Sequence, residues 1–569
     1  MRQVLRPDPR PDPADRAARY RQLADSWHRV VLYRVWLVLL VPYLVVRVAW
    51  TDLSTALGPV ALAFDLLAVL VTAATVLPAR RAYLPQPVPA GRDRPVVDCL
   101  LPTHLEDVAI IEPTVIAARR IRGVRRVLLL GNVERPEVDR LCRRHGVTYL
   151  PRGTNVSAKA GNLNNGLRHT DADLVLVLDA DHIARPDLLD HVVGYFDDPR
   201  VAYVQAPQTY YNTGSFLFRP MHGEPAGWNE QYPFYLCQQV ARNGARAPMF
   251  MGSTAVLRRA ALADIGGFAE GSVTEDVHTS LRLQGRGWTG VFTPEPLAFG
   301  LEAGSLREYH TQRRRWSTGA VDLLVRSPDS PLRAPGLPFR ARLGFLGYLL
   351  GQFAGPARLG LLLVPMTILV TAVSPVTVPY LMFGPVWAGW YLLSLAVTVT
   401  LHRGTTRARY LEAYAWGVMP ALVSGALGIL VRTREFAWSR KDGGRADRHW
   451  ARWALPTLLA GALGGVAWVL RPGAHWSALV GWNVSFTLYQ AAALALFLGY
   501  LRRFERAPGG EPGTILAGAA RVDWVMAQLA AGRLGPPDRL VRPPLVPDPA
   551  TRGEPVSVVG AHPHPGEVG

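Results

Sequence analysis

Apolar stretches of membrane-spanning length lie on both sides of a long segment of mixed character. A helix needs about 20 apolar residues to cross a bilayer. Six stretches of roughly this length occur, at about 30–50, 56–78, 343–373, 381–401, 454–470 and 477–500. Taken in pairs, they form the segments 30–78, 343–401 and 454–500. The pattern therefore predicts six transmembrane helices around one soluble domain, residues 91–330.

The segment 91–330 is predicted to be an α/β domain. Four short apolar runs are typical of buried strands: Val96–Leu101, Val127–Leu130, Leu174–Leu178 and Val201–Val204. Helix-like segments alternate with these runs, which is typical of a mostly parallel sheet covered by helices. Ligands bind beyond the carboxyl ends of the strands in such sheets. The polar residues that follow each strand are therefore the first candidates for a functional site.

Three further segments complete the predicted organisation. The polar start of the chain, 1–29, and its Pro/Gly-rich end, 503–569, are expected to be cytosolic tails. We expect the second tail to be disordered except for one short helix near 519–531. Residues 407–433 are apolar but flanked by arginines, which favours an amphipathic helix at the membrane interface, within the segment 407–452. A seventh span at 407–433 is the alternative.

Composition and charge agree with a membrane protein that has a large cytosolic part. Hydrophobic residues make up 49% of the 569 residues and charged residues 19%, with a net charge of +18. The basic residues cluster between the apolar stretches, as the positive-inside rule expects of cytoplasmic loops. This places the soluble domain and both termini in the cytosol and the helices in the cell membrane. No nucleic-acid-binding motif accompanies the charge, so nucleic acid is not expected as a partner.

Two carboxylates stand two residues apart at the end of one predicted strand. Asp179 and Asp181 project to the same side of an extended segment. Mg²⁺ and Mn²⁺ prefer oxygen ligands and are often held by one or two carboxylates together with substrate phosphates. The pair therefore predicts a metal site for a diphosphate, with a solvated acidic loop as the alternative.

A third carboxylate precedes a helix-like segment later in the chain. Asp276 follows Thr274 and Glu275. A base that removes a proton from a sugar hydroxyl must be a carboxylate or similar group close to the acceptor. Asp276 also suits the start of a helix, where an acid stabilises the N-terminus. The two roles are compatible.

Basic and amide residues supply candidate ligands for a nucleotide. Gln312, Arg315 and Trp316 share one face of a helix, and arginine binds phosphate oxygens in a bidentate manner. We expect Arg313 and Arg314 to lie at the bilayer, as basic residues next to a membrane helix do. Only two of the 62 basic residues are lysines, Lys159 and Lys441. Lys159 opens a predicted helix, where its ammonium suits a phosphate.

These motifs together resemble the processive family-2 glycosyltransferases, and within them the bacterial cellulose synthase catalytic subunits. The resemblance extends from about Val96 to Arg503. It rests on five motifs: Asp179-Ala180-Asp181, Thr274-Glu275-Asp276, Gln312–Trp316, Phe250-Met251-Gly252-Ser253 and Phe436–Lys441. It implies a GT-A-like α/β domain between transmembrane helices, and an enzyme that extends a polysaccharide from a nucleotide sugar.

The resemblance also implies a role for each motif residue. Asp276 would be the catalytic base, and Asp179 and Asp181 the ligands of Mg²⁺ or Mn²⁺. The donor and its diphosphate would be bound by Lys159, Asp179, Gln312, Arg315, Glu106 and Asn132. The acceptor would be bound by Trp316, Gly252 and Ser253. Gating of the nucleotide site would be carried out by Phe436, Ser439 and Lys441.

Two positions depart from the family where the base binds. Where the family has Tyr-Asn-Glu, this chain has His104-Leu105-Glu106, and where the family has an acidic loop, this chain has Leu130-Gly131-Asn132-Val133. UDP-glucose is the expected donor, but these changes leave the base open. The expected product is a β-glucan such as cellulose, passed across the lipid bilayer as a growing polysaccharide, with export partners in the periplasm or at the cell surface.

Two other functions fit part of the same pattern. One is a non-processive glycosyltransferase that adds a sugar to a lipid acceptor. The other is a non-catalytic channel or scaffold that has lost donor binding through the changes around Asn132. The retained Asp179, Asp276 and Arg315 weigh against the second alternative.

Overall fold

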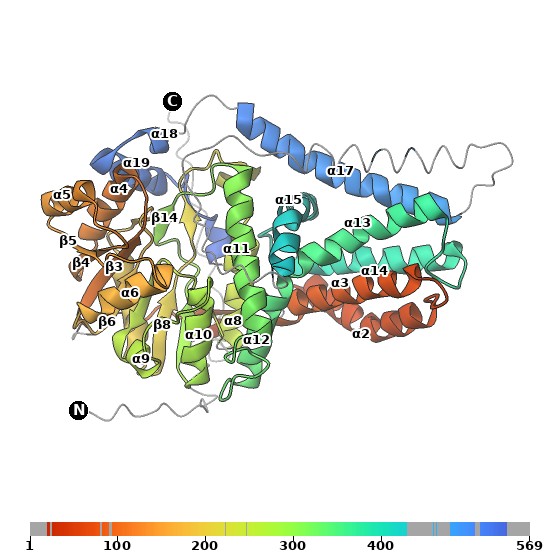
Figure 1. Cartoon of the computed structure of the whole chain (residues 1–569), viewed down its shortest axis with the longest axis horizontal. Coiled ribbons are helices and arrows are strands. Elements are labelled where there is room, and N and C mark those ends of the chain that lie inside the picture. Colours follow the sequence, from red (N-terminus) through yellow and green to blue (C-terminus); the bar gives the residue numbers. More distant parts are fainter. Residues whose placement is uncertain are drawn as a thin grey trace, which may run out of the picture.

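The protein consists of an α/β domain and a group of long helices (Figure 1). A computed structural model describes residues 20–22, 26–79, 82–89, 91, 94–221, 224–245, 247–428, 459, 463, 478–506 and 512–542. The sheet domain occupies the left of Figure 1 and the long helices the right. The predicted gating residues, Phe436, Ser439 and Lys441, lie outside the described residues.

A seven-stranded sheet forms the centre of the soluble domain. Its strands are β3 (Val97–Thr103), β4 (Val124–Gly131), β5 (Thr148–Pro151), β6 (Leu174–Val177), β8 (Val201–Gln205), β12 (Ala255–Arg258) and β13 (Thr289–Phe292). Their order across the sheet is β13-β8-β12-β6-β3-β4-β5. β12 is antiparallel to both of its neighbours, and every other pair is parallel. The four predicted strands are present, within a mostly parallel sheet.

Both faces of this sheet are buried, because helices cover each of them. Leu174 and Leu176 belong to one hydrophobic cluster, while Val175 and Val177 of the same strand belong to another. Alternate residues of a strand point to opposite faces, so β6 contributes to two cores. This explains why its sequence reads as a continuous apolar run rather than an alternating one.

Helices of the soluble domain begin at residues suited to helix ends. The helices that matter for the site are α4 (Val108–Arg119), α6 (Ala158–Arg168), α10 (Glu275–Gly285) and α11 (Leu306–Val325). Before α11, the Ser305 hydroxyl accepts a hydrogen bond from the Glu308 amide at 3.2 Å, and the Glu308 carboxylate accepts one from the Gly304 amide at 2.8 Å. This reciprocal cap satisfies amides that have no partner within the helix, so the start of α11 is well defined.

Five helices among the described residues are long and apolar enough to cross a membrane. They are α2 (Trp27–Ala49), α3 (Leu57–Ala79), α13 (Ala354–Thr371), α14 (Tyr380–Leu401) and α17 (Ala478–Arg506). The predicted span at 454–470 falls outside the described residues, apart from Leu459 and Leu463.

The prediction of one long helix over 343–373 is wrong. Two helices occupy this stretch, α12 (Phe339–Gly351) and α13. Pro356 lies in the first turn of α13, where its missing N–H is tolerated, whereas inside a continuous helix it would break a hydrogen bond. α12 packs against α3 and α11, and α13 continues among the apolar helices.

The predicted interfacial helix is present as α15 (Ala408–Leu427). It packs along α11, α13 and α17 and lies between the sheet domain and the long helices (Figure 1). If residue 425 carried a β-carbon, that atom would lie only 2.5 Å from the Ser317 side chain, which is too close. Gly425 therefore allows α15 to pack closely against α11. α15 is not among the five apolar helices, and its position at a membrane interface stays a prediction.

The end of the chain is ordered over part of the predicted disordered tail. Residues 512–542 contain α18 (Pro512–Ile515), α19 (Gly518–Ala530) and α20 (Asp538–Val541). α19 matches the short helix expected near 519–531 and packs on α4, with Val522 and Val525 buried. The prediction of disorder is therefore wrong for the parts of 512–542 outside the expected helix, which are ordered where the apolar face of α19 covers the apolar face of α4.

Candidate active site

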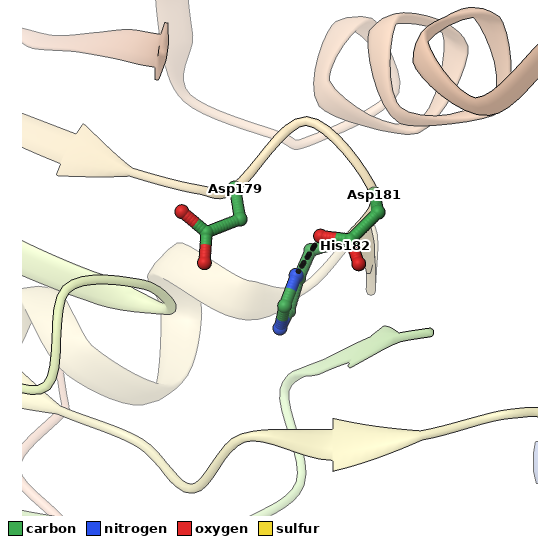
Figure 2. Close-up of side chains that lie close together, drawn as sticks. All are labelled: Asp179, Asp181 and His182. Atoms are coloured by element: carbon green, nitrogen blue, oxygen red, sulfur yellow. Dashed lines mark hydrogen bonds and ion pairs between the residues drawn. The ribbon is translucent and has the colours of Figure 1, made fainter. Parts of the chain in front are cut away.

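The predicted metal ligands lie on a loop that leaves β6. Asp179, Asp181 and His182 offer ligand atoms that all lie within 4.8 Å of one another. Figure 2 shows the three side chains gathered on one side of this loop. The Nδ1 of His182 is 3.0 Å from Asp181, while its Nε2 is buried without a hydrogen-bond partner in the described part of the protein. Two carboxylates and an imidazole suit a divalent cation such as Mg²⁺ or Mn²⁺.

Neighbouring segments hold this loop in place. The backbone amide of Asp179 donates to the Ser253 hydroxyl at 2.9 Å, and the amide of Leu301 donates to Asp181 at 3.3 Å. A β-carbon on Gly300 would lie 2.6 Å from the His182 ring, so the absence of a side chain there makes room for the imidazole. Ser253 is fully buried. Its hydroxyl supports the metal loop, a position that does not fit the predicted contact with an acceptor.

Lys159 stands beside the metal loop. It lies in the first turn of α6, and its ammonium forms an ion pair with Asp179. Burial lowers the pKa of Lys159, but the charges of Asp179 and Glu275 outweigh this effect and the net pKa is raised. The side chain is therefore a stable cation among carboxylates, at the place where an anionic diphosphate would need one.

Asp276 faces the same space from the start of α10. Its carboxylate accepts a hydrogen bond from the Val277 amide at 2.8 Å. Burial and the neighbouring charge of Glu275 raise the pKa of Asp276 to about 7, although Lys159 and Arg315 act in the opposite direction. Asp276 is thus able to accept a proton near neutral pH, as a general base must.

The side chains predicted on α11 also reach this space. Gln312, Arg315 and Trp316 all line the cavity that contains Asp179 and Asp276. The Oε1 of Gln312 is buried and has no hydrogen-bond partner among the described residues. Buried polar atoms are normally paired, so this oxygen is available to a ligand.

The two other arginines of this helix differ from each other. Arg314 is exposed. Arg313 turns inward, where it forms an ion pair with Glu230 and also lines the cavity. The prediction that Arg313 lies at the bilayer is therefore wrong. The sequence around Arg313 could not reveal its ion pair, because Glu230 lies 83 residues earlier in the chain. The one signal elsewhere in the sequence was the polar run Asn229–Gln231, which lies between two aromatic residues that the structure buries.

Polar groups fill the region where a nucleotide base was expected. The Asn132 amide nitrogen is 2.6 Å from Asn155 Oδ1 and 2.9 Å from His104 Nδ1, and its oxygen accepts a hydrogen bond from Arg152 at 3.1 Å. The Glu106 carboxylate turns back onto its own loop and accepts bonds from the Thr103 hydroxyl and the His104 amide, both at 2.7 Å. Asn132 and Glu106 both line the cavity. The hydrogen bonds of Asn132 to His104, Asn155 and Arg152 were not predicted from the sequence.

One large cavity joins these groups to the apolar helices. Its volume is about 1070 Å³. Beyond the residues already described, its wall includes Tyr43, Asp65, Arg358, Trp387, Trp390, Tyr391 and Glu412. These side chains belong to α2, α3, α13, α14 and α15. The candidate site is therefore continuous with a space among the helices that are long enough to span a membrane.

Comparison with known proteins agrees with this arrangement. Residues 174–504, more than half of the chain, match the family described as Glycosyl transferase family group 2. The chain is 30% identical over 506 residues to the cellulose synthase catalytic subunit [UDP-forming] of Pseudomonas fluorescens, covering 83% of this chain and 66% of that protein. It is 32% identical over 348 residues to cellulose synthase 1 catalytic subunit [UDP-forming] of Komagataeibacter xylinus, covering 60% and 46%.

The chain spans less than two thirds of the length of these curated relatives, and only 18% of the relative named cellulose synthase 1 from K. xylinus.

Among solved structures, a mannosyltransferase from Pyrobaculum calidifontis in complex with GDP-Man and Mn²⁺ is 21% identical to this chain and has a TM-score of 0.48. The match covers 66% of this chain and all of that chain. The α/β domain is GT-A-like, with apolar helices on both sides of it in the sequence. This chain belongs to glycosyl transferase family group 2, and five helices of its described part are long and apolar enough to cross a membrane.

Proposed function

We propose that the protein is an inverting, processive β-glycosyltransferase that polymerises UDP-glucose into a β-glucan such as cellulose and passes it across the membrane. The observation that carries this proposal is the continuous cavity. Asp179 and Asp276 lie at its soluble end, and Trp387 and Tyr391 lie at its membrane end. A product held in this space would extend from the site of transfer into the membrane region.

The donor would bind with its diphosphate over the metal loop. Asp179 and Asp181, with His182 beside them, would hold Mg²⁺ or Mn²⁺. The ion would supply Lewis-acid stabilisation of the leaving diphosphate. Lys159 and Arg315 add positive charge on the same cavity, and such fixed charges stabilise the anion that develops during transfer.

Asp276 would take the proton from the acceptor hydroxyl. The acceptor oxygen then forms a bond to the anomeric carbon, while the bond from that carbon to the diphosphate oxygen breaks. The electron pair of the broken bond leaves with the diphosphate. A single displacement of this kind inverts the configuration at the anomeric carbon, so an α-linked donor yields a β-linked product.

The acceptor would lie between Asp276 and the membrane helices. Trp316 offers a flat apolar surface for a sugar ring at the level of the site. Trp387, Trp390 and Tyr391 offer further rings deeper in the cavity. Aromatic rings bury large apolar area while leaving hydroxyl groups free to hydrogen-bond elsewhere. This arrangement supports retention of a polymer between successive transfers.

The proposal extends to the topology of the protein and to its partners. The soluble domain and both termini would lie in the cytosol, where nucleotide sugars are available. Phe436, Ser439 and Lys441 would cover the nucleotide site, as the family resemblance implies. Proteins of the periplasm or cell surface would receive the emerging polysaccharide.

The test uses membrane vesicles that contain the full chain and a panel of labelled nucleotide sugars with Mg²⁺ or Mn²⁺. We expect polymer from UDP-glucose, sensitive to a β-glucanase and absent when the metal is removed by a chelator. Polymer from a different donor would change the substrate but keep the reaction. A short, lipid-extractable product would favour the non-processive alternative, and no product from any donor would overturn the proposal.

A further inference from the structure

Arg313 stands between two aromatic rings of its own helix. Its guanidinium carbon is 5.0 Å from the centre of the Tyr309 ring and 4.7 Å from the centre of the Trp316 ring. Tyr309, Arg313 and Trp316 are spaced four and three residues apart on α11, so they share one helix face. The cation is thus in contact with the face of the indole predicted to bind the acceptor sugar.

Glu230 determines where this guanidinium lies. Its carboxylate forms an ion pair with Arg313 and also accepts a hydrogen bond from the Tyr309 hydroxyl at 3.2 Å. The side chains of Glu230 and Arg313 are each only 15% exposed. Both residues line the same cavity as Trp316. An ion pair shielded in this way is screened little by solvent, so it restrains both side chains.

The backbone that carries Glu230 is itself anchored. Its neighbours Asn229 and Gln231 both donate to the buried carboxyl group of Glu302, at 3.0 and 3.2 Å. The next side chain along the network, Tyr210, accepts a hydrogen bond from Gln231 at 2.8 Å. Glu230 therefore projects toward α11 from a fixed position rather than from a mobile loop.

This arrangement leaves one face of the indole for a ligand. Because Arg313 lies over one face of Trp316, a sugar ring can stack only on the other. The terminal torsion of a tryptophan side chain has a broad energy profile. Without the guanidinium, the ring would be free to turn away from the geometry that stacking requires.

We propose that Arg313 and Glu230 are positioning residues that hold the Trp316 ring against a pyranose unit of the acceptor. The inference rests on the proposed function, because it assigns the acceptor to Trp316. The proposal gives the two arginines on either side of Arg314 different roles. Arg315 faces the donor diphosphate, whereas Arg313 acts on the acceptor through Trp316. Arg313 and Glu230 are expected to affect the acceptor end of the reaction and not the binding of the donor.

The test compares Arg313→Gln, Glu230→Gln and Arg313→Lys in the purified full chain. Arg313→Lys keeps a charge for Glu230 but loses the flat guanidinium that lies over the ring. The matched control is Arg326→Gln, which removes a solvent-exposed pair with Asp322 at the end of the same helix. Thermal melting checks that each variant is folded, and Glu230→Gln, which changes no volume, keeps the test valid if Arg313→Gln does not fold.

Two measurements report on the acceptor separately from the donor. The first is binding of cellohexaose by calorimetry, which needs no turnover. The second is the fraction of labelled UDP-glucose consumed that ends in polymer rather than in free glucose. We expect about tenfold weaker cellohexaose binding in Arg313→Gln and Glu230→Gln, because a ring that takes the stacking orientation only about a tenth of the time binds the sugar correspondingly more weakly. The transferred fraction should fall, while the KM for the donor stays within about twofold.

The outcomes distinguish this inference from the proposed function. If the wild type forms no polymer from any nucleotide sugar, the proposed function fails whatever the variants do. If the wild type forms polymer, but Arg313→Gln and Glu230→Gln bind cellohexaose and transfer glucose as the wild type does, the positioning role is wrong. A parallel loss of donor affinity and transfer would also overturn it, because that result indicates a general structural defect.

Discussion

A β-carbon on Gly252 would lie 3.1 Å from a carboxylate oxygen of Asp276 and 3.1 Å from the Nζ of Lys159. Gly252 therefore occupies the gap between the predicted base and the cation beside the metal loop. Its φ is +83°, in the left-handed region that glycine adopts without strain. The bare backbone at this position leaves the space in which the acceptor oxygen and the anomeric carbon would meet.

Gly252→Ala should abolish turnover at a moderate cost in stability. The methyl group would enter the gap between Asp276 and Lys159, and the left-handed backbone would cost roughly 1–2 kcal/mol. Gly266→Ala is the matched control, because Gly266 also has a φ of +83° but a β-carbon there would meet no atom within 4 Å. Gly266→Ala should show a similar fall in melting temperature and only a slight fall in polymer synthesis. Equal loss of synthesis in both variants would contradict the steric explanation.

Asp276→Asn should remove most of the transfer activity while leaving donor binding intact. An amide cannot accept the proton of the acceptor hydroxyl, and loss of a general base lowers rates by about 10²–10⁴-fold. Initial rates of polymer formation and equilibrium binding of UDP measure the two effects. Asp322→Asn, on the exposed side of α11, serves as the control for an unrelated carboxylate. Retention of more than about a tenth of the activity would exclude Asp276 as the base.

The activity should rise with pH toward neutrality. Burial raises the pKa of Asp276 to about 7, so the ionised form that can accept a proton is lost as the pH falls below that value. Well below the pKa, kcat/KM for the donor should drop about tenfold for each pH unit, because this ratio reports ionisation of the free enzyme. A profile that stays level from about pH 5 to pH 8 would indicate an ordinary carboxylate pKa instead.

Asn132→Ala should weaken donor binding more than it slows transfer. Asn132 connects His104, Asn155 and Arg152 in the part of the cavity where the base is expected. Its removal takes a hydrogen-bond partner from each of these side chains and disturbs the shape of that pocket. The KM for the donor should rise about tenfold with little change in kcat. Inhibition by free UDP, GDP and ADP, measured in parallel, identifies the base that the pocket prefers.

Val525→Asp should destabilise the soluble domain through α19. Val525 is fully buried where α19 packs on α4. An unpaired carboxylate at this contact should cost more than about 2 kcal/mol. Asp523→Ala removes the exposed pair with Arg120 on the same helix, and such a change should cost within about 1 kcal/mol. Rates of thermal inactivation measure both. Equal stability of the two variants would mean that α19 adds little to the domain.

The candidate catalytic motifs could be recognised from the sequence because each is short and contiguous. Asp179 and Asp181 follow an apolar strand, and Asp276 lies at the start of a helix; both features are visible within a few residues. β5, β12 and β13 were not predicted, since each is short and, unlike the apolar run of β6, is interrupted by a polar residue, a proline or a glycine. The break between α12 and α13 was also missed, although Pro356 lies in the first turn after it.

Contacts between distant residues are what the sequence could not reveal. Arg313 reads as a basic residue near a membrane until Glu230, from another part of the fold, is placed beside it. Ser253 reads as part of an acceptor loop, yet its hydroxyl supports Asp179. In each case the side chain has more than one plausible partner in the sequence. Only the packing of the elements chooses between these partners.

The sequence by itself determined most of the apolar helices, four strands of the sheet and the chemical type of the site, because local hydrophobicity and short motifs control these features. The tertiary structure decided how the parts meet. It brought Gly252 between Lys159 and Asp276, turned Arg313 toward Trp316, and joined the site to a cavity among the long apolar helices. These relationships depend on the close packing of residues far apart in the chain, which no local pattern encodes.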